Sequence, residues 1–175
     1  QLRQDIYLTC NKAVTGHRVI YTSDGSAPHF IGSFGWSCAT AEGCRLANNK
    51  GPAKGYRTSS FRAEAYGILS LLRFIFRSFE YTGMEYPEKI CLYTDSLSLV
   101  QKIFSHSQFH EYYPNATMEP EWDILQAIKF TRKTLPTNVS IDHVKGHQDN
   151  HTSFSRLSIQ AQLNVEADKL AAEYT

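Results

Sequence analysis

The feature that most constrains the fold is a short apolar strand, residues 89–94, which lies between segments with helical periodicity. Such a nearly continuous apolar run is typical of a central strand that helices cover on its faces. Before it, apolar residues recur at i, i+3, i+4 and i+7 spacing from Phe61 to Phe76, which predicts a long amphipathic helix that Gly83 and Pro87 end. We therefore expect a sheet flanked by helices, which is an α/β fold.

Three β-rich segments precede this helix. Residues 18–23 stop at the turn signal 24–26, residues 30–40 stop at the tight reversal 41–43, and a weaker strand runs over 44–50. Short turns between them predict an antiparallel meander. A loop, 51–58, then leads to Ser59 and Ser60, both plausible N-caps of the helix.

The chain after the apolar strand continues the alternation of helices and strands. The expected elements are helix 96–104, loop 105–118, helix 120–133, strand 139–144, loop 148–157 and helix 158–174. The predicted order is therefore β-β-β-α-β-α-α-β-α. At 175 residues, with 42% hydrophobic content, the chain suits one compact domain. We expect that domain to span 18–175, with 1–17 as an incoming segment or linker from a preceding domain.

Composition excludes some partners and compartments. No apolar run reaches the roughly 18 residues of a membrane span. The net charge of +1 means that nucleic-acid binding would depend on a local basic surface or on metal ions. The four cysteines show no zinc-site spacing and predict buried free thiols. The sequons at Asn115, Asn138 and Asn150 would matter only in a secreted protein, whereas we expect an intracellular one, cytoplasmic or nuclear.

Three acidic residues stand where predicted elements converge. Asp24 ends the first strand, Asp95 ends the central apolar strand, and Glu64 lies near the start of the long helix. Carboxylates at the carboxyl ends of parallel strands can hold divalent cations, and two such ions can act on a phosphodiester. Taken singly, each acid has an ordinary alternative: a turn former, an N-cap or an acid favoured by the helix dipole.

Five short motifs, in order, resemble the motif set of the ribonuclease H family. They are Ser23-Asp24-Gly25-Ser26, Arg62-Ala63-Glu64, Tyr93-Thr94-Asp95-Ser96, Val144-Lys145-Gly146-His147 and Asn164-Val165-Glu166-Ala167-Asp168. The resemblance covers roughly residues 19–172. It implies a ribonuclease H-like fold with a five-stranded mixed sheet, antiparallel in its first three strands, and an endonuclease that cuts the RNA strand of RNA–DNA hybrids. The segment 161–168 looks closest to ribonuclease H domains of retroelement polyproteins, which implies an upstream reverse-transcriptase domain.

Carried onto this chain, the resemblance implies that Asp24, Glu64, Asp95 and Asp168 bind two Mg²⁺ ions, with Mn²⁺ as a plausible substitute. Glu166 competes with Asp168 for the last position. The two lie about 200° apart around a helix, so only one can face the site. The family pattern N-x-x-x-D favours Asp168, and we expect Glu166 to face solvent.

Two histidines and a lysine lie in or next to the fourth motif. The family motif implies an auxiliary catalytic role for His147, in proton shuttling or product release, although a loop histidine without a function is the alternative. His143 is expected to be structural. Lys145 either meets a phosphate or is solvated.

The residues that would read the substrate depart from the family pattern. Many members have asparagines where this chain has Ser60 and Phe61, and a polar residue where it has Leu97. Substrate contacts are therefore expected from Gly25, Ser26, Ser60 and Asn164. The loop 148–157 is expected to be a substrate-side flap or a surface insertion. The stretch between the helices 96–104 and 120–133 lacks a basic cluster, which suggests weak binding by the domain alone.

Two alternatives stay open at this point. An integrase- or transposase-like polynucleotidyl transferase of the same superfold would use a Glu on the last helix, for which Glu166 is the candidate, but the segment 62–64 argues against it. A non-catalytic nucleic-acid-binding module of the same fold is the second. The presence of all four acids argues against lost activity, because an inactive site has no need for mutually repelling carboxylates.

Overall fold

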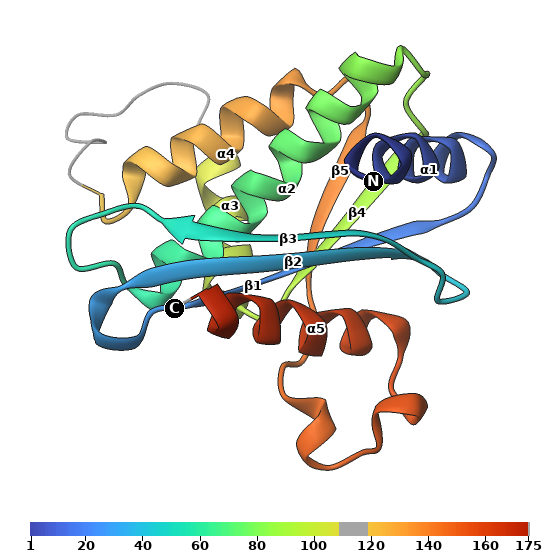
Figure 1. Cartoon of the computed structure of the whole chain (residues 1–175). Coiled ribbons are helices and arrows are strands. Elements are labelled where there is room, and N and C mark those ends of the chain that lie inside the picture. The colour runs from blue at the N-terminus through green and yellow to red at the C-terminus, as the bar shows by residue number, and fades with distance from the viewer. Residues whose placement is uncertain (109–118, 175) are drawn as a thin grey trace.

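The computed structural model describes residues 1–108 and 119–174 and contains a five-stranded mixed sheet in the order β3-β2-β1-β4-β5 (Figure 1). The strands are β1 (Val19–Ser26), β2 (Gly32–Thr40), β3 (Arg45–Ala53), β4 (Lys89–Thr94) and β5 (Asn138–His143). The first three pair antiparallel, and β4 pairs parallel with both β1 and β5. The predicted sheet is confirmed.

Helices cover both faces of the sheet (Figure 1). One face carries α1 (Leu2–Val14), α2 (Ser60–Thr82), α3 (Leu97–Ser107) and α4 (Trp122–Thr134), and the other carries α5 (Ile159–Tyr174). Short 3-10 turns are η1 (Pro28–Phe30), η3 (Gln148–Asn150) and η4 (Phe154–Arg156). The Ser59 hydroxyl accepts a hydrogen bond from the Arg62 amide at 3.1 Å, which confirms Ser59 as the N-cap of α2.

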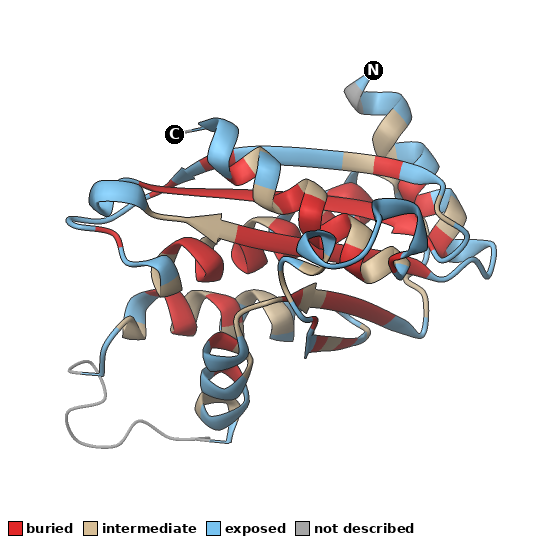
Figure 2. Ribbon diagram, turned by 90° about the horizontal axis from the view of Figure 1, so that it is seen from below, coloured by how far each residue is buried: buried red, intermediate tan, exposed pale blue. Residues whose placement is uncertain are grey.

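The main core lies between the sheet and α2 (Figure 2). Large side chains there, such as Trp36, Ile68 and Leu92, are at most 2% exposed. A smaller core of Ile20, Ala39 and Leu163 fills the space under α5. The Ser33 hydroxyl also donates to the Ala171 carbonyl at 2.7 Å, which ties α5 to β2.

The first 17 residues contain a helix that their sequence did not predict. In α1, Thr9 and Cys10 are buried, at 2% and 0% exposure, against the rest of the fold. Small side chains such as Cys10 and Ala13 give a weak periodic signal, so tertiary packing rather than amphipathicity stabilises this helix. The boundary at residue 18 stays a prediction.

Smaller differences concern element ends and one cysteine. The strand β3 ends at Ala53 rather than near residue 50, and it includes Pro52. An edge strand tolerates proline because the backbone on its outer side needs no amide donor. Cys10, Cys38 and Cys91 are buried free thiols as expected, whereas Cys44 is exposed because it follows a surface turn. Helix α3 takes up 105–107 of the expected loop, while 109–118, including the sequon at Asn115, lie outside the described residues. Among the residues described, no helix has the length and apolarity to cross a membrane.

Candidate active site

The parallel pairing of β1 and β4 brings the acidic residues together. Ser23 on β1 is in register with Thr94 on β4, so Asp24 and Asp95 follow at the same edge of the sheet. Glu64 reaches this edge from the N-terminal part of α2. Carboxylate oxygens of Asp24, Glu64 and Asp95 all lie within 4.8 Å of one another. The three acids that the sequence placed at element ends therefore form one cluster.

Two glycines allow the close approach of backbone segments in this cluster. A Cβ at Gly25 would lie 2.3 Å from the Glu64 amide nitrogen, so the end of β1 rests directly on the backbone of α2. A Cβ at Gly146 would lie 2.3 Å from Asp95 Oδ2. Gly146 was not among the expected site residues, although it belongs to the motif 144–147. Any side chain there would displace the Asp95 carboxylate.

Burial and mutual repulsion make the cluster costly to ionise. Asp24 is 4% exposed, and burial, with the neighbouring charges of Asp95 and Asp168 as further causes, raises its pKa to about 7. Burial and the charge of Asp24 raise the pKa of Glu64 well above its usual range. Burial also raises the pKa of Asp95, while the charge of His147 opposes that shift. The cluster is thus built to hold positive charge.

Hydrogen bonds orient two of these carboxylates. The Gly25 amide donates to Asp24 Oδ1 at 2.7 Å, and the Thr94 hydroxyl donates to Glu64 Oε2 at 3.3 Å. These donors satisfy only part of the acceptor capacity of the two carboxylates. Oxygen ligands held in this way, with raised pKa values, fit hard divalent cations such as Mg²⁺. The three carboxylates could therefore hold a divalent metal ion.

The last helix brings Asp168 and not Glu166 toward the acids. The charge of Asp168 raises the pKa of both Asp24 and Asp95, although its oxygens are not among those within 4.8 Å. Glu166 instead pairs with Arg45 at 2.7 Å on the sheet side of α5. The expectation that Glu166 faces solvent was wrong, because α5 packs across β1 and β2 and this side chain reaches Arg45 on β3.

His147 lies at the rim of the cluster. Its side chain is 66% exposed, and Nδ1 stands 4.0 Å from Asp168 Oδ2. The backbone at His147 has a φ of 51°, a left-handed conformation uncommon for a non-glycine residue. His143 is exposed at the end of β5, so it is not a core residue. Its charge opposes the rise in the pKa of Asp95 that burial causes. Lys145 is exposed.

The predicted substrate-contacting residues occupy different depths. Ser60 is exposed at the start of α2, and Gly25 and Ser26 are half-buried at the end of β1. Asn164 is 2% exposed, and its Nδ2 has no hydrogen-bond partner among the described residues. Phe61 packs against the main core, which explains an apolar residue there. Contact of these residues with substrate stays a prediction.

A comparison with protein-family models decides the family. The RNase H model matches residues 16–175, nearly the whole chain. The chain belongs to the RNase H family. This ribonuclease H therefore has the fold, and the nuclease class, that its motifs implied. A search of curated protein sequences found no match.

Solved structures with this fold include cellular and viral proteins. RNase H1 of the archaeon Halobacterium salinarum NRC-1 superposes with a TM-score of 0.59 at 17% identity, over 90% of this chain and 99% of that one. The RNase H domain of PFV gives 0.61 at 19% identity, over 90% and 93%. The foamy viral protease-reverse transcriptase, solved with an RNA/DNA hybrid, gives 0.62 at 14% identity, over 91% of this chain and 20% of that one. At these identities the likeness shows a shared fold.

Proposed function

We propose that this ribonuclease H hydrolyses the RNA strand of RNA–DNA hybrids with two Mg²⁺ ions held by Asp24, Glu64, Asp95 and Asp168. The observation that carries the proposal is the group of three carboxylates within 4.8 Å of one another, of which Asp24 and Glu64 are buried and Asp95 is half-buried. Buried carboxylates this close repel unless protons or cations compensate them. The family match supplies the reaction class.

The cofactor follows from the chemistry of the donors. Asp24, Glu64 and Asp95 would hold the ions, and Asp168 would complete the set from α5. Mn²⁺ would substitute, because it accepts the same oxygen ligands. When bound, the divalent cations supply positive charge that offsets the negative charge developing on the phosphodiester.

The remaining residues bind substrate and handle protons. Gly25 and Ser26 directly follow Asp24, and Ser60 lies one helical turn before Glu64, so these residues would meet the 2′-hydroxyls that distinguish RNA from DNA. His147, exposed and 4.0 Å from Asp168, can exchange a proton at Nδ1 with solvent. We assign it an auxiliary role in catalysis.

The setting of this domain is also a proposal. A similar fold forms about a fifth of the foamy viral protease-reverse transcriptase, which supports a retroelement origin with an upstream reverse-transcriptase domain. Such a domain would hold the hybrid, in agreement with the net charge of only +1. The four free thiols suit a reducing intracellular compartment, cytoplasmic or nuclear.

A cleavage assay tests the proposal directly. Labelled RNA–DNA hybrid, duplex DNA and duplex RNA are incubated with the protein in Mg²⁺ and in EDTA. We expect cleavage of RNA in the hybrid only, dependent on Mg²⁺, and no cleavage by Asp95→Asn while its circular dichroism spectrum stays that of the wild type. Cleavage of duplex DNA alone would favour an integrase-like activity, and wild-type rates from Asp95→Asn would refute the metal site.

A further inference from the structure

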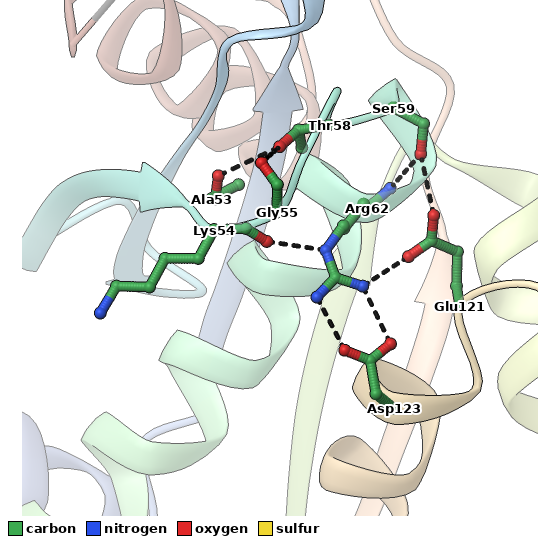
Figure 3. Close-up of polar contacts among 8 residues, drawn as sticks. All are labelled: Ala53, Lys54, Gly55, Thr58, Ser59, Arg62, Glu121 and Asp123. Carbon is green, nitrogen blue, oxygen red and sulfur yellow. Dashed lines mark hydrogen bonds and ion pairs between the residues drawn. The ribbon is translucent and has the colours of Figure 1, made fainter. Parts of the chain in front are cut away.

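Arg62 is the member of the motif 62–64 that the proposed function leaves without a role. Its side chain is 16% exposed and donates hydrogen bonds to three residues in two other segments of the chain (Figure 3). Nε donates to the Lys54 carbonyl at 2.7 Å, Nη1 to Glu121 Oε2 at 2.6 Å, and Nη1 and Nη2 to the two oxygens of Asp123 at 2.9 and 2.7 Å. We call this set, with Ser59, the Arg62 clamp.

The clamp joins the start of α2 to the start of α4. Ser59, the N-cap of α2, donates from its hydroxyl to Glu121 Oε1 at 3.4 Å, so both ends of the Glu121 carboxylate are used (Figure 3). Glu121 precedes α4 with a φ of 59°, a left-handed conformation that costs free energy in a residue with a Cβ. Its two hydrogen-bonded oxygens offset that cost.

Only a guanidinium can make this set of contacts. Its planar fork binds the Asp123 carboxylate through two nitrogens while Nε reaches the Lys54 carbonyl. A lysine ammonium is a single point of charge and would satisfy one partner at a time. Without Arg62, the carboxylates of Glu121 and Asp123 would also face each other without a compensating cation.

The clamp acts on the first turn of α2, which also carries site residues. Arg62 and Glu64 are two positions apart, about 200° around the helix, so the clamp holds one side while Glu64 faces the acids on the other. The backbone at Glu64 rests on Gly25, where no Cβ fits. A shift of this turn would therefore change the spacing of Asp24 and Glu64 and move Ser60 with it.

We propose that Arg62 is a positioning residue: the clamp holds the first turn of α2 so that Glu64 and Ser60 keep their places relative to the metal site and the substrate. The inference rests on the proposed function, since it names what the clamp serves. Removing a residue that orients a metal ligand typically weakens metal binding about 10- to 100-fold. A purely structural pair would leave the affinity of the folded protein unchanged.

The test compares Arg62→Ala and Arg62→Lys with Arg77→Ala. Arg77 lies on the same helix and pairs with Glu80 at 2.8 Å, but both side chains are more than half exposed. Mg²⁺ binding is measured by isothermal titration calorimetry, and kcat and KM on a hybrid in parallel. Both Arg62 variants should bind Mg²⁺ at least about tenfold more weakly and raise KM. Arg77→Ala should match the wild type.

A second variant with isosteric changes tests the inference even if Arg62→Ala does not fold. Glu121→Gln together with Asp123→Asn preserves shape, and should weaken Mg²⁺ binding in the same direction. Adding Arg62→Ala to this pair should cause little further loss, because all three changes break one clamp. Clamp variants that are folded yet bind Mg²⁺ and hybrid like the wild type would overturn the inference. A wild type that binds Mg²⁺ but cleaves no hybrid would instead count against the proposed function.

Discussion

Replacing Asp24 by asparagine tests whether the acid cluster destabilises the metal-free fold. The pKa of Asp24 rises from 3.8 to about 7, chiefly through burial. Each pKa unit corresponds to 1.36 kcal/mol, so the ionised carboxylate costs at most about 4 kcal/mol at pH 8. In the wild type the Gly25 amide donates to Asp24 Oδ1 at 2.7 Å. Asparagine removes the charge but keeps a side-chain oxygen that can accept this hydrogen bond. We expect Asp24→Asn to stabilise the metal-free protein at pH 8 by about 1 to 4 kcal/mol.

The assay is urea unfolding in EDTA, followed by circular dichroism at pH 8 and pH 5. Between pH 4 and 7 the folded chain keeps a proton on Asp24 that the unfolded chain releases, so wild-type stability falls as the pH rises through this window. The gain from Asp24→Asn should therefore fall by about half at pH 5, while Asp149→Asn, an exposed control, should change little at either pH. Adding Mg²⁺ should raise the free energy of unfolding of the wild type more than that of the variant. A variant that is destabilised at pH 8, or gains equally at both pH values, would refute the reasoning.

Four further substitutions probe other parts of the site, all by hybrid cleavage and one also by calorimetry. His147→Ala should lower kcat by about 10- to 100-fold without abolishing it, as for an auxiliary proton carrier, and total loss would make His147 an essential catalyst. Gly146→Ala should reduce the Mg²⁺ affinity measured by calorimetry, and the cleavage rate, by at least about tenfold, because the new Cβ displaces Asp95 Oδ2. An unchanged affinity would show that the backbone at residue 146 moves instead of the carboxylate. Asp168→Asn should abolish most activity while Glu166→Gln keeps it, and the reverse result would exchange their roles.

Local sequence predicted the three clustered acids because each lies near the end of an element. Asp95 follows β4, and Glu64 lies early in a helix whose periodicity is strong. Asp24 lies two residues before the end of β1, because the strand continues through the expected turn 24–26 to Ser26. The position of Glu166 was mispredicted, since helical spacing places it opposite Asp168 without showing what lies there. On that side lies Arg45 of the edge strand β3, whose Nη2 is 2.7 Å from Glu166 Oε1. Helix α1 was missed for a similar reason. Cys10 stabilises this helix only by packing against the main core, which lies elsewhere in the chain.

The sequence by itself determined the order of strands and helices from residue 19 onward, the three acids that cluster and, through its motifs, the family. These depend on turn signals, periodicity and residue type, which act between neighbours in the chain. Only the tertiary structure decided that β1 and β4 pair in parallel, that Gly146 passes against Asp95, and that Arg62 reaches Glu121 and Asp123. Desolvation and charge repulsion depend on distances through space, so the raised pKa values of the acids, and with them the demand for cations, appear only when the chain is folded.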